Sequence, residues 1–293
     1  MDAEHTIDCD DDTDRLSVEL LDELASNERR TADIRQLEAR HSWLKEFAKS
    51  PAHARHAALF DRDETLSMRM GTATHAMLSN TSPVVQCAHR RGTKARKAFE
   101  ADQAPGTLIV SPGEFRKSTR MADAIKRNKV AERVLFEKGV IHEQTIHWEY
   151  KGRKCRATPD ARCFRTVSEL KTCKSADLKW FSRDASKMFY HAQLGSYRHA
   201  IKAETGVFPT EAYIFAVENV EPFVVTPFKL TERALEVGWR LWKGWLDALL
   251  LCEKTDTWIE YTLGIEELDM ADDMADVEIA MRDDDGRRMD VAF

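Results

Sequence analysis

Apolar residues recur at intervals of three and four in several stretches of the chain, which is the spacing of one helical face. This pattern predicts helices over residues 31–48, 52–59, 68–79, 116–138, 185–205 and 231–254. Elsewhere the apolar period falls to two, which predicts strands over residues 145–150, 153–157, 166–172, 211–218 and 223–228. The polar stretch 80–113, which contains Gly and Pro, is predicted to be mostly loop. Helices interleaved with strands in this order predict one mixed α/β domain.

The charged residues are distributed unevenly along the 293-residue chain, whose formal net charge is −6. Residues 1–14 contain seven acidic residues and no Lys or Arg, and residues 264–293 contain eleven acidic residues and three arginines. The segment between them, residues 15–263, carries a net charge of +9. We therefore predict a folded domain over residues 15–263 between acidic, disordered ends at 1–14 and 264–293. A basic body suits a polyanionic partner, and solvated surface Lys and Arg would give the same charge.

The sequence lacks the features of a secreted or membrane-spanning protein. No stretch approaches the roughly 18 to 20 unbroken apolar residues of a transmembrane helix. The N-terminal segment lacks the basic start and apolar core of a signal peptide. None of the six cysteines forms a C-x-x-C pair, which argues against a zinc ribbon or a thioredoxin-type redox site. We therefore expect reduced thiols in a cytoplasmic protein that does not contact membranes.

The candidate chemistry lies in Pro159-Asp160, followed after eight residues by Glu169-Leu170-Lys171. Residues two apart in a strand share a face, so Glu169 and Lys171 point the same way while Leu170 points into the opposite layer. Asp160 ends the preceding strand, where Pro159 stops ladder pairing. If the two strands pair as a hairpin, the carboxylates of Asp160 and Glu169 converge.

Two carboxylates a few ångströms apart repel each other unless a cation joins them or one takes up a proton. Mg²⁺ and Mn²⁺ prefer such oxygen ligands, with water completing the coordination shell. Lys171 beside them would orient a water nucleophile and stabilise charge that develops on a phosphate. Taken alone, the segment also fits an ordinary surface strand with a Glu–Lys pair.

Further motifs occur in a fixed order around this segment. They are Ser50-Pro51-Ala52-His53, Gly71 to His75, Glu143 to Trp148, Pro159-Asp160, Glu169 to Thr172 and Tyr190 to Tyr197. Together they resemble the PD-(D/E)xK nuclease superfamily, and more narrowly the exodeoxyribonuclease VIII (RecE-type) C-terminal nuclease of phage recombination systems. The resemblance covers residues 31–260, nearly the whole basic segment. It implies an α/β fold with a restriction-endonuclease-like PD-(D/E)xK core, in which helices flank a central mixed β-sheet.

Residue by residue, the resemblance implies a metal site and a catalytic lysine. It assigns Asp160 and Glu169 as metal ligands and catalytic residues, and the Leu170 carbonyl as a further ligand. It assigns Lys171 as the catalytic lysine. His75 matches a helix-borne catalytic histidine that contacts the metal or positions it, whereas an isolated histidine would more often be a satisfied core residue. The implied cofactor is Mg²⁺, with Mn²⁺ also supporting activity.

Two further positions match motifs whose roles are less direct. Gln193 and Tyr197 lie four apart on one helical face and match a motif that lines the same cleft, which implies substrate binding. A simple polar helix face is the alternative interpretation of this pair. Glu143 precedes a strand at a matching position, where it either serves the site, caps the strand or pairs with a neighbouring base.

The resemblance implies a metal-dependent exonuclease that degrades linear duplex DNA in the 5′→3′ direction, in phage-type recombination or repair. It also implies a ring-shaped homo-oligomer and a partner annealing protein that coats the exposed single strand. Related nucleases with an iron–sulfur cluster carry a cysteine trio near the C-terminus, where this chain has Cys252, so no cluster is expected. The alternatives are an endonuclease on the same fold and a DNA-binding module that has lost cleavage. The intact Asp160, Glu169 and Lys171 weigh against the second alternative.

Overall fold

The computed structural model describes residues 33–60, 64–262, 264–267, 279–282 and 288–291. The chain divides into two compact units, Met1–Trp258 and Ile259–Phe293. In the second unit, β10 (Ile279–Arg282) pairs antiparallel with β11 (Arg288–Val291). This hairpin lies within residues 264–293, for which the sequence predicts disorder. The acidic composition of the whole segment hides its short apolar alternation. The acidic residues 1–14 lie outside the described residues.

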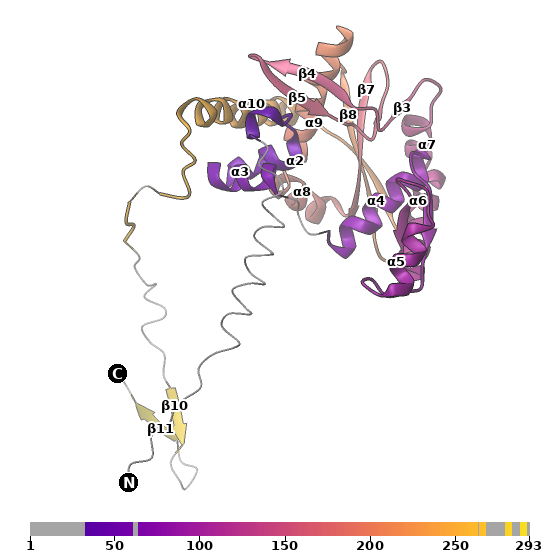
Figure 1. Cartoon of the computed structure of the whole chain (residues 1–293), viewed down its shortest axis with the longest axis horizontal. Helices are drawn as coiled ribbons and strands as arrows, with labels where there is room; N and C mark the ends of the chain where they lie inside the picture. Colours follow the sequence, from indigo (N-terminus) through magenta and orange to yellow (C-terminus); the bar gives the residue numbers. More distant parts are fainter. Residues whose placement is uncertain (1–32, 61–63, 263, 268–278, 283–287, 292–293) are drawn as a thin grey trace, which may run out of the picture. The chain divides into compact units, whose positions relative to one another are not determined.

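A five-stranded mixed sheet forms the centre of the first unit (Figure 1). Its strands are β3 (Ile141–His142), β6 (Ala161–Arg162), β7 (Thr166–Cys173), β8 (Glu211–Glu218) and β9 (Val225–Lys229). The strand order is β3-β6-β7-β8-β9, in which β7 and β8 run parallel and the other neighbours pair antiparallel. This arrangement confirms the predicted α/β fold with a central mixed sheet.

Helices cover both faces of this sheet and enclose two separate apolar cores. One face packs against α9 (Tyr190–Thr205) and α10 (Glu232–Thr255), and Val167 and Ile214 point into that core. The other face packs against α4 (Leu66–Ser79) and α6 (Pro112–Arg127) (Figure 1). Leu170 belongs to the apolar core on this second face. Since side chains alternate along a strand, Glu169 and Lys171 share the side of Val167 and face α9. The predicted opposition of Leu170 to Glu169 and Lys171 is therefore confirmed.

Two glycines allow α9 and α10 to pack with their backbones in contact. A Cβ atom added at Gly238 would lie 2.0 Å from the carbonyl oxygen of His191, and one at Gly195 would lie 2.8 Å from the backbone nitrogen of Trp239. Alanine at either position would therefore push the helices apart. Close packing also buries Trp242 and Leu246 against β4 and the helices around it.

The remaining elements surround this core. A hairpin joins β4 (Ile146–Tyr150) to β5 (Arg153–Ala157), as predicted. A two-stranded parallel sheet pairs β1 (Val84–Gln86) with β2 (Leu108–Val110). The other helices are η1 (Ile34–Gln36), α2 (His41–Leu44), η2 (Lys45–Ala48), α3 (Pro51–Leu59), α5 (Lys94–Ala101), α7 (Lys129–Leu135) and α8 (Leu178–Lys187). None of the helices in the described part of the chain is long and apolar enough to cross a membrane.

Three of the predicted helices are interrupted. In the segment predicted as one helix over 31–48, the described residues 33–48 form the short helices η1, α2 and η2 instead. The segment 116–138 divides at Asn128, whose side chain accepts hydrogen bonds from two backbone N–H groups and so begins α7. The segment 185–205 divides at Phe189, which has a positive φ of 57° and separates α8 from α9. This last break places Tyr190 beside the residues of the candidate site.

The stretch 80–113, predicted to be mostly loop, also contains β1, α5 and β2. The inward-facing residue of α5 is Arg96, which is 4% exposed. Its guanidinium donates to the Ile109 carbonyl at 2.9 Å and pairs with Glu100 at 2.6 Å. Because the helix buries an arginine instead of an apolar stripe, hydrophobic periodicity does not reveal it.

Candidate active site

The site forms where β6 begins, because beyond this point one edge of β7 has no partner from β6. The ladder pairs Ala161 with Ser168, and Pro159 has no N–H with which to continue it. The next free amide of β7, the Leu170 N–H, donates to Oδ2 of Asp160 at 2.6 Å. Asp160 therefore lies directly before β6 rather than at the end of β5, and its carboxylate is fixed against the middle of β7.

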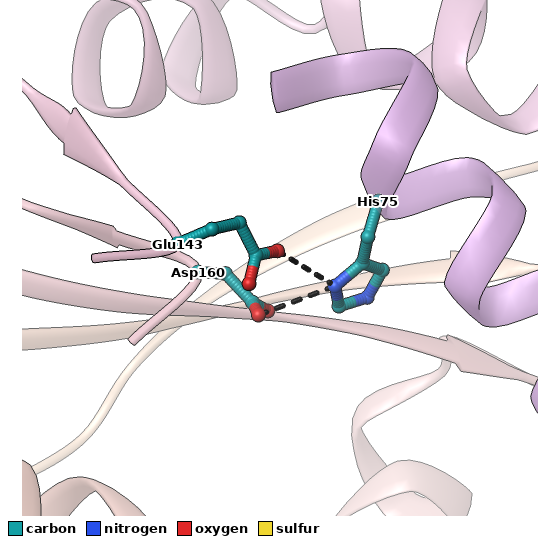
Figure 2. A group of neighbouring side chains, drawn as sticks. All are labelled: His75, Glu143 and Asp160. Carbon is teal, nitrogen blue, oxygen red and sulfur yellow. Dashed lines mark ion pairs between the residues drawn. The ribbon is translucent and has the colours of Figure 1, made fainter. Parts of the chain in front are cut away.

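The other oxygen of Asp160 belongs to a cluster with His75 and Glu143 (Figure 2). Nδ1 of His75 lies 3.2 Å from Oδ1 of Asp160 and 3.6 Å from Oε1 of Glu143. One ligand atom from each residue lies within 4.8 Å of the others. The three side chains come from α4, the residue after β3, and the residue before β6, so tertiary folding alone brings them together.

The Gly71-to-His75 motif positions the imidazole through the close approach of α4 to β7. A Cβ atom at Gly71 would lie 3.4 Å from Oγ1 of Thr172, at ordinary contact distance. His75 follows one helical turn later and therefore lies on the same face of α4. Helix α4 therefore lies against β7 at Gly71, and the histidine one turn later reaches the acids at the edge of the strand.

Glu143 reaches the cluster through an unusual backbone conformation. Its φ of 52° lies in the left-handed region, which residues with side chains adopt rarely. The Glu143 N–H donates to the backbone oxygen of Asp160 at 3.3 Å, so the two acids lie opposite each other at the end of the β3–β6 pair. Among the interpretations that the sequence leaves open for Glu143, the geometry favours a place in the site.

Glu169 lies on the α9 side of β7 in a network of hydrogen bonds. Its Oε1 atom accepts from Nζ of Lys171 at 2.8 Å and from Nε2 of Gln193 at 2.7 Å. The same Gln193 nitrogen donates to the Tyr197 hydroxyl at 2.8 Å. The Lys171 ammonium also lies 4.9 Å from the centre of the Tyr190 ring. Gln193 thus holds Glu169 and also contacts Tyr197, and the predicted role of these two residues in substrate binding stays a prediction.

The donor groups fit a divalent cation. Oε2 of Glu169 is buried and has no hydrogen-bond partner among the described residues. Burying a carboxylate oxygen without a hydrogen-bond partner costs folding free energy unless a cation or a proton binds to it. Asp160 and Glu143 add carboxylate oxygens, and His75 adds an imidazole nitrogen. Hard oxygen donors of this kind suit Mg²⁺ or Mn²⁺.

Charges in the site shift the pKa values of its members in different directions. Burial disfavours the charged forms of His75 and Asp160, but their mutual attraction and hydrogen bond outweigh it. As a result the pKa of His75 is raised to about 10 and the pKa of Asp160 is lowered. Burial, followed by the charge of Asp160, raises the pKa of Glu169 to about 7 despite the neighbouring Lys171. Burial disfavours the charged form of Lys171, but attraction to Glu169 and Asp160 outweighs this effect and raises the pKa of Lys171.

A basic concavity of about 380 Å³ opens beside Lys171. Its walls include Arg40, His41, Lys45 and Arg156. Burial, with the charges of Lys45 and Lys171, lowers the pKa of His41 to about 3, so this imidazole is neutral at physiological pH. The remaining side chains give the concavity a positive charge directly next to the acids. The sequence does not single out these residues, because they lie on separate elements and carry no local motif.

The structure therefore places the predicted residues Asp160, Glu169, Leu170, Lys171 and His75 in one site, together with Gln193 and Tyr197. Their predicted roles stay predictions. The Ser50-to-His53 motif does not join them. Ser50 instead caps α3, accepting from the His53 N–H at 3.3 Å, and Pro51 occupies the first helical turn.

The comparisons with known proteins agree with this geometry. A family model described as a PDDEXK-like domain of unknown function (DUF3799) matches residues 40–269. The chain therefore belongs to this PDDEXK-like family, and its fold is that of the PD-(D/E)xK nucleases. A search of curated protein sequences finds no match.

The comparison with solved structures finds two exonucleases among its matches. A crystal structure from Eubacterium rectale, described as a "putative exonuclease", has a TM-score of 0.57 and 13% sequence identity, covering 83% of this chain and 94% of that one. An alkaline exonuclease from Laribacter hongkongensis has 14% identity and covers 63% of this chain and 95% of its own, with a TM-score of 0.26. The first likeness shows the shared fold, and the second score is too low to bear on it.

Proposed function

We propose that this protein is a divalent-metal-dependent deoxyribonuclease that degrades linear duplex DNA from its ends. The observation that carries the proposal is the set of acids at the β6–β7 edge, with Lys171 beside it and one buried oxygen of Glu169 without a partner among the described residues. Membership of a PDDEXK-like family supports the class of chemistry. The basic concavity beside Lys171 and the +9 charge of residues 15–263 support a polyanionic substrate.

Asp160, Glu143, His75 and Glu169 are the residues that would hold Mg²⁺ or Mn²⁺. When bound, such an ion supplies Lewis-acid charge to the phosphodiester and lowers the pKa of a water nucleophile. The Leu170 N–H keeps Asp160 oriented toward this position. His75 must lose its proton before its Nδ1 atom can serve as a ligand, so ion binding at this cluster releases a proton.

Lys171 would act on the phosphate side of the site. Its ammonium is held by Glu169 at 2.8 Å and stays protonated, so it donates hydrogen bonds and does not act as a base. A fixed positive charge at this place stabilises the negative charge that develops on the phosphate during in-line attack. Gln193 keeps Glu169 in place through its 2.7 Å hydrogen bond and thereby keeps Lys171 oriented.

The finer features of the proposal derive from the family resemblance. They are a 5′→3′ direction, a ring-shaped homo-oligomer around DNA, a partner that anneals single strands, and a role in phage-type recombination or repair in the cytoplasm. Each of these would place the same site at a DNA end. None of them is needed for the hydrolytic step itself.

Incubation with linear and supercoiled forms of one plasmid tests the proposal. An exonuclease degrades the linear duplex in Mg²⁺ and spares the closed circle, and EDTA abolishes the reaction. The variant Asp160→Asn should be inactive, and Asp123→Asn, which changes an exposed acid on α6, should match the wild type. Nicking of the circle would instead establish an endonuclease, and a mobility shift without cleavage would establish a DNA-binding module.

A further inference from the structure

The outer face of α8 combines an exposed aromatic ring with positive charge. Trp180 is 55% exposed. Lys179 and Arg183 both contact its ring, at 5.9 and 5.3 Å from the ring centre. Lys187 lies one further turn along the same exposed stripe. Within α8, the acidic residue is Asp184, so the helix is basic overall.

The opposite face of α8 anchors the helix to the core and leaves Trp180 without a structural task. Phe181 is 3% exposed and stacks on Phe228 of β9, with ring centres 4.8 Å apart and planes within 3° of parallel. A large aromatic side chain is normally used to bury apolar area. Trp180 points away from that core, so its ring is available to a binding partner.

The basic stripe leads toward the candidate active site. After Lys187, the chain continues through Met188 to Tyr190, and both residues line the space on either side of Lys171. Eight residues separate Trp180 from Met188, which corresponds to about 12 Å along a helix. A strand that passes along α8 would therefore reach the catalytic region within a few nucleotides.

We propose that the outer face of α8 binds single-stranded DNA, with a base stacked on Trp180 and phosphates contacted by Arg183 and Lys187. The proposal rests on the proposed function, because a nuclease that degrades one strand of a duplex exposes the other. Stacking on an aromatic ring suits any base, and flanking cations suit the backbone, so the recognition is independent of sequence. A protein partner would also use an exposed tryptophan, but two cations in contact with the ring favour a polyanion.

Binding of a fluorescent oligothymidine of about 12 nucleotides, measured by anisotropy in EDTA, tests this assignment. We expect Trp180→Ala to weaken binding about tenfold and Trp180→Phe to restore most of the affinity, since a phenyl ring still stacks. Lys187→Glu should weaken binding and reduce its salt dependence. Phe164→Ala, which removes a 73% exposed ring between β6 and β7, is the matched control and should have no effect.

Hydrolysis of bis(p-nitrophenyl) phosphate, which is too small to reach α8, separates this proposal from the proposed function. The Trp180 variants should hydrolyse it at the wild-type rate. Unchanged oligothymidine binding by Trp180→Ala, or no binding by the wild-type protein, overturns the assignment while that activity persists. A change in oligomeric mass on Trp180→Ala, without a change in DNA binding, would make this face a subunit contact and also overturn it.

Discussion

The two sides of the candidate site shift the pKa values of their carboxylates in opposite directions. Asp160 meets the Leu170 N–H and the His75 imidazole, and its pKa is lowered. Glu169 lies on the neighbouring strand β7, yet burial and the charge of Asp160 raise its pKa to about 7. The charge of Asp160 is compensated by groups at both of its oxygens, whereas Lys171 and Gln193 meet only one oxygen of Glu169.

This difference has a simple structural cause. Asp160 lies at the open end of β6, where a strand amide and α4 supply donors to both of its oxygens. Glu169 turns toward α9, where Lys171 and Gln193 both bind the same oxygen and leave Oε2 buried without a partner among the described residues. The first side is therefore preorganised by protein groups, and under the proposed function a metal ion would complete the second.

The largest expected effect is on cleavage, which requires both sides of the site. Asp160→Asn, Glu169→Gln and Lys171→Ala should each slow the degradation of linear duplex in Mg²⁺ by on the order of a hundredfold or more. The triple variant should be hardly slower than the single ones, because the residues act as a unit. Initial rates of degradation measure these losses, and circular dichroism shows whether each variant is folded. Near-wild-type activity of one variant would remove that residue from the site.

The sequence predicts one side of this site better than the other. Asp160, Glu169 and Lys171 lie within twelve residues of one another on neighbouring strands, so strand periodicity alone relates Glu169 to Lys171. The ligand cluster on the other side needs Glu143, whose position depends on a left-handed backbone and on the pairing of β3 with β6. Local patterns do not encode such long-range pairing.

The same limit applies to the fold. Strands and helices with apolar periodicity, such as β4, β5, β7 and α10, lie close to their predicted positions. The helix α5 is missed because it buries Arg96, and the break between α8 and α9 is missed because no Gly or Pro marks it. The helical spacing of Gln193 and Tyr197 relates these two residues to each other, but the hydrogen bonds from Gln193 to Glu169 and to the Tyr197 hydroxyl appear only in three dimensions.

Metal-dependent stabilisation should be the next largest effect. Mg²⁺ or Mn²⁺ binds the native state selectively and should raise the melting temperature by about 5 °C at saturating concentration. Asp160→Asn and Glu143→Gln should both reduce this rise, whereas Asp123→Asn should not. Thermal unfolding with and without the ion measures it. A full rise in Glu143→Gln would exclude Glu143 from the cluster with Asp160 and His75.

Gln193 should have a smaller effect that distinguishes positioning from substrate binding. Gln193→Ala removes one hydrogen bond to Glu169 and should reduce kcat and metal affinity roughly tenfold. Losses of this size are typical when a residue that positions a metal ligand is replaced. The KM for DNA should stay close to the wild-type value. Tyr197→Phe, which removes only the hydroxyl that Gln193 also contacts, should have the same effects in weaker form. A raised KM with unchanged metal affinity would instead support a direct contact with DNA.

The smallest expected effect is on the pH dependence of stability in EDTA, and it tests the contrast between the two acids directly. Glu169 has an ordinary pKa of 4.5 when unfolded and a pKa of about 7 when folded, because of burial and Asp160. Between these values the native state binds more protons than the unfolded state, so this group makes stability fall as pH rises. His41 acts in the opposite sense, since burial lowers its pKa to about 3 and its contribution to stability rises with pH up to about 6.5.

The informative quantity is therefore the difference in melting temperature between the Glu169→Gln variant, whose residue 169 does not titrate, and the wild type. This difference should shift in favour of the variant by a few degrees from about pH 5 to about pH 7.5. Glu149→Gln on the exposed side of β4 is the control and should show no such trend. A difference that stays constant over this range would mean that Glu169 ionises as readily as Asp160, and the contrast between the two sides would be lost.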